Sequence, residues 1–250
     1  MASQPPFLNA GNAGPFTLDG TRTYRIGKRD MALVDPGPLE EDHIRALVSW
    51  VRDVRVVRIL LTHGHGDHAG SATALAREIG ADVFGPPGLV GVDRPLEHGD
   101  PVSTDEGDLV ALHTPGHTAD HLSYHWRDRN ALFAGDLLLG RGNTTWVAEY
   151  PGCVADYLAS LARLRDLDLQ VIYPAHGPPL TDPQGALDRF EAHRMARIRQ
   201  VAEVRREDPF VTAEALVSRV YGEALPPDMI PAATRSLAAL LEFLEAGNEA

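Results

Sequence analysis

Four side chains that could bind a metal ion lie within six consecutive residues, His63 to His68, which read His-Gly-His-Gly-Asp-His. The stretch offers three imidazoles and one carboxylate, and its two glycines allow tight turns, so several of these side chains can converge on one point. Such ligands, without a thiolate, suit zinc, iron or manganese. A single His-x-His pair is equally compatible with two histidines in a turn, so a metal site needs further ligands from elsewhere in the chain.

Three later segments each add one such ligand beside glycine or proline: His117 in TPGH, Asp136 in FAGD and His176 in YPAHG. The combined five histidines and two aspartates are too many for one tetrahedral ion, but they fit two ions that share a bridging ligand. Two metal ions a few ångströms apart, with a hydroxide between them, form a hydrolytic site. The ordered set therefore predicts a dinuclear hydrolytic centre.

The elements that must position these residues alternate between strand and helix up to about residue 180. Apolar runs and alternating patterns predict strands at 16–27, 31–37, 56–62, 81–85, 108–113, 121–126, 131–139 and 171–177. A period of 3.6 residues predicts helices at 39–52, 70–79, 154–168, 183–207, 212–221 and 233–246. Two mixed sheets covered by helices satisfy this order, and so does a doubly wound parallel sheet. Periodicity does not decide between them.

The composition argues against several classes of protein. The 250 residues carry a formal net charge of −12, which argues against a chain that coats nucleic acid electrostatically, although a local basic strip is compatible with it. Cys153 is the single cysteine and excludes an intrachain disulfide. No apolar run is long enough to span a membrane, and the first residues do not resemble a signal peptide. We therefore expect no membrane partner and a cytoplasmic location; the sequence does not indicate the oligomeric state.

The ordered ligand series resembles the metallo-β-lactamase superfamily, whose HxHxDH motif matches residues 63–68. The resemblance implies an α+β protein with an αββα sandwich, which decides the choice of fold. It also implies that Asp35, in LVDPG, lies next to a metal ligand and orients it without binding the ion itself. The ligand set implied for the first ion is His63, His65 and His117; for the second ion it is Asp67, His68 and His176, with Asp136 bridging both ions.

Within the superfamily, several segments resemble the β-lactamase-like protein 2 and glyoxalase II-like branch: GPFTLDGTRTY, TPGHTADHLSY, FAGDLLLGRGNTTW, YPAHGP and EAHRMARIRQ. This resemblance implies a catalytic domain over 1–180 and a helical, winged-helix-like extension over 181–250. Residue 250 leaves little room for a final wing hairpin, so we expect the extension to lack one.

The expected function is hydrolysis by two zinc ions per chain, with iron or manganese fitting the same ligands. A metal-bridging hydroxide would attack an ester-type bond of a small molecule, namely a thioester, lactone or ester, and Asp67 would relay a proton. One alternative is an endoribonuclease that cleaves single-stranded RNA, since the same branch includes an enzyme with this activity. A minor alternative is a non-catalytic metal-binding module. The net charge favours a small substrate over RNA.

Further residues could support the site or contact the substrate. Thr144 and Thr145 follow Asp136 closely and could hydrogen-bond an oxyanion, although a plain turn explains them equally well. The remaining candidates lie in segments that match the branch: His121, His193 and Arg194. Arginines are dense over 189–206, where an amphipathic helix facing solvent competes with a strip that contacts phosphate.

Overall fold

The structure is a computed structural model that describes residues 4–222 and 225–247. It divides into two compact units. The first comprises residues up to 114 together with 120–142 and 167–183; the second comprises 115–119, 143–166 and the segment from 184 onward. The units therefore do not follow one boundary along the chain, and the division at 180/181 stays a prediction about sequence domains.

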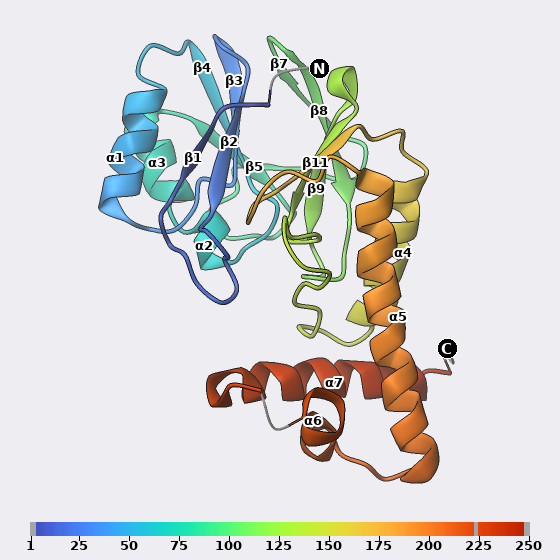
Figure 1. The fold of residues 1–250 in the computed structure, drawn as a ribbon. Coiled ribbons are helices and arrows are strands. Elements are labelled where there is room, and N and C mark those ends of the chain that lie inside the picture. Colours follow the sequence, from blue (N-terminus) through green and yellow to red (C-terminus); the bar gives the residue numbers. More distant parts are fainter. Residues whose placement is uncertain (1–3, 223–224, 248–250) are drawn as a thin grey trace. The chain divides into compact units, whose positions relative to one another are not determined.

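The first unit contains two sheets (Figure 1). One sheet has the order β1 (Phe7–Asn9), β2 (Arg22–Ile26), β3 (Asp30–Val34), β4 (Val56–Leu60), β5 (Asp82–Gly85), β6 (Arg94–Pro95). The other has the order β11 (Val171–Pro174), β10 (Ala131–Gly135), β9 (Leu122–Trp126), β8 (Gly107–His113), β7 (Pro101–Thr104). The α-helices described in this unit are α1 (Glu41–Trp50), α2 (Gly66–Ala69) and α3 (Ala72–Ile79).

Alternation along the strands builds two cores. In β3, Ala32 and Val34 face a core that also contains Tyr124 and Phe133 of the other sheet, whereas Met31 and Leu33 face a core closed by α1 and α3. Figure 1 shows these two helices beside the first sheet. Helix, sheet, sheet gives three consecutive layers of the predicted αββα sandwich. The antiparallel β7–β8–β9–β10 pairs exclude the doubly wound parallel sheet.

Parallel strands carry the candidate ligands to the sheet edges. β3 and β4 run parallel, as do β10 and β11. Because parallel strands end at the same edge of a sheet, Asp35 and the His63–His68 stretch leave one sheet side by side, and Asp136 and His176 leave the other.

Most predicted strands run past the observed ends: those expected at 31–37, 56–62 and 171–177 end at Val34, Leu60 and Pro174. Two depart further. The strand expected at 16–27 begins only at Arg22, because Gly20 has a φ of 108° and its N–H donates to the carbonyl of Thr17, which closes a turn. The strand expected at 131–139 ends at Gly135, whose φ of 50° turns the chain out of the sheet. The short strands β1, β6 and β7 were not among the predicted elements.

The second unit is helical, with α4 (Cys153–Arg165), α5 (Pro183–Glu207), α6 (Ala213–Tyr221) and α7 (Ile230–Glu245). Thr212 caps the N-terminus of α6, because its hydroxyl accepts a hydrogen bond from the Ala215 N–H at 3.3 Å. Within the described part of this unit no residue forms a strand, so the predicted helical extension is confirmed and no wing hairpin accompanies it there. None of the helices in the described ranges has the length and apolar character that a membrane crossing requires.

Candidate metal centre

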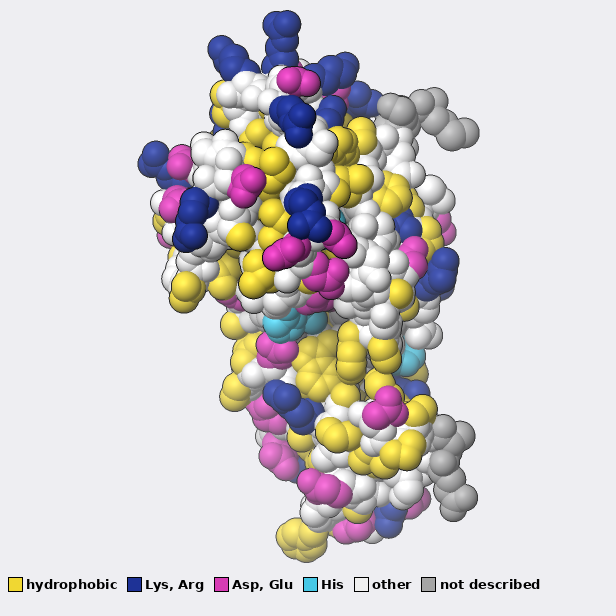
Figure 2. Space-filling view, turned by 90° about the vertical axis from the view of Figure 1, so that its left-hand side faces the viewer, with side chains coloured by type: hydrophobic (Ala, Val, Ile, Leu, Met, Phe, Trp, Pro, Cys, Tyr) yellow, Lys and Arg dark blue, Asp and Glu magenta, His cyan; other side chains and the backbone are white. Residues whose placement is uncertain are grey.

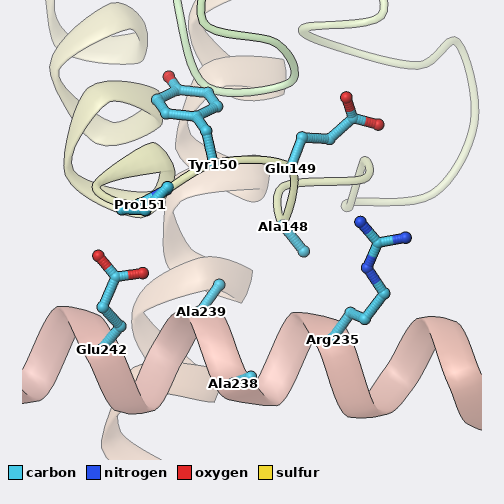
Figure 3. Close-up of a pocket in the computed structure, with 8 residues that line it drawn as sticks. All are labelled: Ala148, Glu149, Tyr150, Pro151, Arg235, Ala238, Ala239 and Glu242. Carbon is cyan, nitrogen blue, oxygen red and sulfur yellow. The ribbon is translucent and has the colours of Figure 1, made fainter.

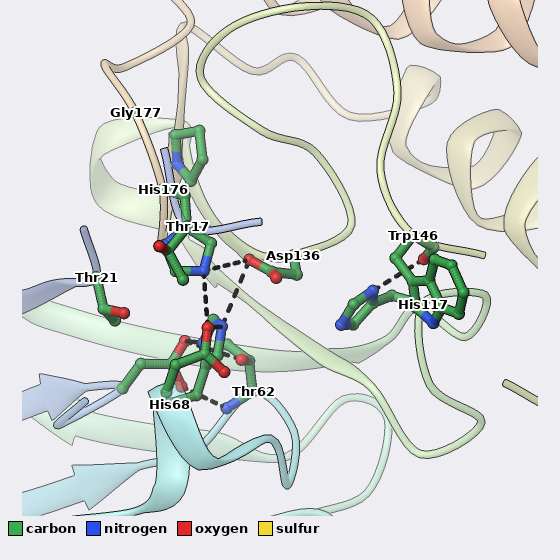
Figure 4. A network of polar contacts seen from close by, with 12 residues as sticks. Thr17, Thr21, Thr62, His68, His117, Asp136, Trp146, His176 and Gly177 are labelled. Atoms are coloured by element: carbon green, nitrogen blue, oxygen red, sulfur yellow. Dashed lines mark hydrogen bonds and ion pairs between the residues drawn. The ribbon is translucent and has the colours of Figure 1, made fainter. Parts of the chain in front are cut away.

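Four ionisable side chains from both sheets of the first unit converge on one point. Asp67 and His68 lie on α2, Asp136 follows β10 and His176 follows β11. One nitrogen or oxygen atom of each lies within 4.8 Å of those of the other three. The Nε2 atom of His176 is 3.2 Å from Asp67 Oδ2 and 3.3 Å from Asp136 Oδ1, as the dashed lines in Figure 4 show for Asp136. His68 Nε2 lies 3.5 Å from Asp136 Oδ1. We call these four residues the acidic cluster.

Asp35 fixes the histidine at the back of the acidic cluster. Its two carboxylate oxygens accept hydrogen bonds from the N–H and the hydroxyl of Thr62, both at 2.8 Å. Its Oδ2 also lies 2.9 Å from His68 Nδ1. A carboxylate can only accept, so Nδ1 of His68 is the donor and Nε2 faces the acidic cluster. The backbone of Asp35 is left-handed, with a φ of 51°, a conformation that aspartate tolerates better than most residues.

Thr62 connects Asp35 to His63 through its hydroxyl group. Its one hydroxyl proton goes to Asp35, so its oxygen accepts from His63 Nδ1, which lies 3.0 Å away. His63 is fully buried, and its ring lies 4.6 Å from that of His65 between centroids. Gly64 separates the two histidines, and a Cβ there would lie 2.6 Å from Leu89 Cδ1. Sequence analysis missed Thr62 as a functional residue, although it directly precedes the histidine stretch.

The N-terminal loop supports His176. The carbonyl of Gly20 lies 3.3 Å from His176 Nδ1, and the Gly177 N–H donates to Asp19 Oδ1 at 2.9 Å. Figure 4 shows Thr17 and Thr21 of the same loop beside His176. His176 therefore also has Nδ1 directed to a backbone oxygen and Nε2 directed to the acidic cluster.

His121 holds the backbone at Asp136. The Asp136 N–H donates to His121 Nε2 at 3.3 Å, and His121 Nδ1 lies 3.0 Å from Thr114 Oγ1. Because Nε2 accepts, the proton of the neutral ring sits on Nδ1. A Cβ on the preceding Gly135 would lie 2.7 Å from both His121 Nε2 and Thr62 Oγ1, so only glycine fits this turn. Sequence analysis assigned no role to Gly135.

Charge coupling inside the acidic cluster shifts its pKa values. Burial lowers the pKa of His176, but the nearby carboxylates of Asp136 and Asp67 outweigh it and raise the pKa to about 9. Burial raises the pKa of Asp136, yet the neighbouring His68 and His176 hold it well below its usual range. The metal-free cluster thus pairs imidazolium with carboxylate, and a cation that binds there replaces the imidazolium protons.

On the face drawn in Figure 2, histidine side chains reach the surface beside acidic and hydrophobic ones.

The other candidates belong to the second unit. His117 is 3 % exposed, and its Nδ1 lies 2.9 Å from the Trp146 carbonyl oxygen. Thr145 is buried, and its carbonyl accepts a hydrogen bond from Arg194 at 3.1 Å. Thr144 is exposed and His193 is half-buried on α5. Their predicted roles at the metal centre, including the grouping of His117 with His63 and His65, stay predictions.

Comparison with known proteins identifies the family of the chain. The model of the metallo-beta-lactamase superfamily matches residues 17–176, and that of the beta-lactamase associated winged helix domain matches residues 212–248. A beta-lactamase-like protein 2 homolog of Caenorhabditis elegans is 35% identical over 225 residues, which cover 85% of this chain and 75% of that protein. An atrochrysone carboxyl ACP thioesterase of Aspergillus chevalieri is 34% identical over 234 residues, covering 88% and 73%.

Two solved structures share the fold. A metallo-beta-lactamase family protein from Thermus thermophilus has a TM-score of 0.80 at 24% identity, covering 97% of this chain and 93% of the other. A beta-lactamase domain protein from Burkholderia ambifaria has a TM-score of 0.84 at 22% identity, covering 96% and 86%. The family match spans most of the first unit and includes all seven predicted ligands. The chain belongs to the metallo-beta-lactamase superfamily.

Proposed function

We propose that this protein is a metal-dependent hydrolase that cleaves the thioester or ester bond of a small acyl substrate. The observation that carries the proposal is the acidic cluster, in which two oriented imidazoles and two carboxylates converge. Relatives add to it, because several carry the name atrochrysone carboxyl ACP thioesterase. The endoribonuclease alternative is supported by no observation of the site, and the net charge of −12 disfavours it.

The residues of the acidic cluster fit a divalent cation. Among the described residues, the buried Nε2 atoms of His68 and His176 have no hydrogen bond of ordinary geometry. Buried polar atoms normally find a partner, so atoms left in this way beside carboxylates are suited to a cation. The proposed ligands are His63, His65 and His117 for one ion, Asp67, His68 and His176 for a second, with Asp136 shared. Zinc as the native metal, two ions per chain and a cytoplasmic location are part of the proposal.

Divalent ions bound there would supply Lewis acidity and lower the pKa of water near neutrality. The chain's own residues would do the rest. Once a cation replaces their protons, His68 and His176 would present Nε2 lone pairs in directions fixed by Asp35 and the Gly20 carbonyl. The Asp67 side chain is 29% exposed, so it can exchange a proton with solvent or with the leaving group. Asp136 is 10% exposed in its side chain and would serve as a fixed anion.

Metal analysis with parallel assays tests the proposal. Protein purified without added metal should contain bound zinc, iron or manganese, measured by plasma mass spectrometry. It should hydrolyse an acyl thioester faster than a lactone, a simple ester or single-stranded RNA, and chelation should abolish turnover. RNA cleavage without thioester turnover would instead favour the endoribonuclease. Metal binding with no turnover of any of these substrates would favour the non-catalytic module.

We expect Asp35→Asn to weaken metal binding about 10- to 100-fold, the range measured when a group supporting a metal-bound histidine is lost. The amide keeps the shape of the carboxylate, but it replaces one acceptor by a donor that opposes Thr62 or His68 Nδ1. Competition titration with a chromophoric zinc chelator measures the effect. Asp105→Asn is the control, because each carboxylate oxygen of Asp105 likewise accepts a hydrogen bond, from the N–H groups of Lys28 and Arg29, but neither donor is a histidine. Equal affinities in the two variants would contradict the prediction.

A further inference from the structure

Arg194, on α5, is a buried arginine held by very few groups. Its side chain is 3% exposed. Its Nη2 donates to the Thr145 carbonyl at 3.1 Å, and its guanidinium lies 5.3 Å from the Tyr157 ring centroid. In the described parts of the chain no ion pair neutralises it, and its Nε has no hydrogen bond. Burying an unpaired charge costs free energy, so we expect Arg194 to have a role other than stabilising the fold.

The carbonyl that Arg194 binds and the carbonyl that His117 contacts belong to consecutive residues. Thr145 presents its carbonyl to Arg194, and the next residue, Trp146, presents its carbonyl to His117 Nδ1 at 2.9 Å, as Figure 4 shows. The two carbonyls belong to consecutive planar peptide groups that meet at the Trp146 Cα, so a shift of the Thr145 carbonyl moves the Trp146 carbonyl unless the φ and ψ of Trp146 change to compensate. A carbonyl only accepts, so the proton of the neutral His117 ring sits on Nδ1 and the lone pair on Nε2. This is the tautomer that could bind a metal ion through Nε2.

Tyr157 provides a second connection within the same unit. It packs against the guanidinium of Arg194 on one side. On the other it lies against the chain just before His117, because a Cβ on Gly116 would lie 2.6 Å from Tyr157 Cα. The Ser160 hydroxyl, one turn further along α4, donates to the Pro115 carbonyl at 2.7 Å. The segment 115–119 is therefore bound to α4 and, through Tyr157, to Arg194.

Helix α7 holds the same loop from another side. The Arg235 guanidinium lies 5.5 Å from the Trp146 ring centroid, and Glu242 accepts a hydrogen bond from the Gly152 N–H at 2.9 Å. Figure 3 shows both side chains directed from α7 toward the segment 148–151, around a cavity of about 280 Å³. The loop that carries the Trp146 carbonyl is thus held at both ends.

We infer that Arg194 is a positioning residue, which keeps the Trp146 carbonyl on His117 Nδ1 and thereby lets the C-terminal helices orient this imidazole. The inference rests on the proposed function in one respect, that His117 binds a metal ion. It goes beyond that function by giving the C-terminal extension a role in orienting one proposed metal ligand, His117, without contact with substrate.

The test compares Arg194→Met with Arg197→Met. Arg197 lies on the same helix and likewise contacts a carbonyl, that of Val220, and a ring, that of Tyr221. Neither group belongs to the loop that carries the Trp146 carbonyl. In metal-free protein labelled with ¹⁵N-histidine, long-range ¹H–¹⁵N spectra report the His117 tautomer. We expect R194M to lose the Nδ1–H signature and to bind one of two zinc ions about 10- to 100-fold more weakly, with the other unchanged. R197M should match the unmodified protein, and R194K should restore part of the loss.

One further variant makes the outcome decisive. His117→Ala should lose the same ion; if it keeps both ions at full affinity, the ligand set of the proposed function is wrong. If H117A loses an ion while R194M keeps the His117 signal and both affinities, the positioning inference alone is overturned. Circular dichroism shows whether each variant folds. Should R194M not fold, R194K carries the test, and an unchanged His117 signal and affinity in R194K would overturn the inference.

Discussion

Replacing Asp136 by alanine should remove at least one equivalent of bound metal and lower kcat/KM for a thioester on the order of 10³-fold, about 4 kcal/mol of transition-state stabilisation. Asp136 is the one carboxylate of the acidic cluster that lies within 3.5 Å of both His68 Nε2 and His176 Nε2. Its loss leaves two imidazoles without the anion that pairs with them, and a shared ligand is lost from both proposed ions.

Metal content by plasma mass spectrometry and steady-state kinetics at saturating zinc measure this effect. Asp168→Ala is the control, because Asp168 is an exposed aspartate in the same unit and outside the acidic cluster. Asp136→Asn separates charge from volume, since it keeps the size of the side chain and one acceptor oxygen. Full activity with two retained ions in D136A would refute the ligand assignment.

The second large effect is expected for Gly135→Ala, which should lower the free energy of unfolding by roughly 2–5 kcal/mol. Part of the loss, about 1–2 kcal/mol, comes from the left-handed backbone at a φ of 50°. The rest comes from a methyl group placed 2.7 Å from His121 Nε2 and Thr62 Oγ1, two buried atoms with fixed hydrogen-bond partners. Because these atoms orient Asp136 and His63, metal affinity should fall too.

Gly80→Ala isolates the backbone contribution. Gly80 has a φ of 67°, and a Cβ there would meet nothing within 4 Å. It should therefore lose only about 1–2 kcal/mol and keep its metal affinity. Urea unfolding in the presence of a chelator measures both variants without the contribution of bound metal. If G135A is no less stable than G80A, the close packing around Gly135 does not have the energetic weight assigned to it.

Much of the site was predictable because its residues stand in recognisable local sequence patterns. The acidic cluster combines Asp67 and His68, found by their clustering, with Asp136 and His176, found by their positions beside glycine at strand ends. The supporting groups were harder to find, since the role of Thr62 depends on Asp35, which is 27 residues away and reaches it only through a left-handed backbone. No local pattern encodes that contact.

The fold shows the same division between local and long-range information. Periodicity located most strands and helices, but whether neighbouring strands run parallel or antiparallel depends on pairing across the chain, so the choice of fold rested on the family resemblance. Residues 16–21 alternate as a strand would, yet Gly20 and the Gly20–Thr17 hydrogen bond form a turn there. That turn brings the Gly20 carbonyl to His176, which explains the departure from the strand pattern.

The convergence of both sheets on the acidic cluster has a consequence for thermodynamic linkage. Its four donors lie between residues 67 and 176, on α2 and at the ends of β10 and β11, so an unfolded chain cannot assemble them. A cation that binds only the folded chain adds to its stability by RT ln(1 + [M]/Kd), or about 1.4 kcal/mol for each tenfold rise in its concentration above Kd. The melting temperature of this protein should therefore report how much metal is available to it.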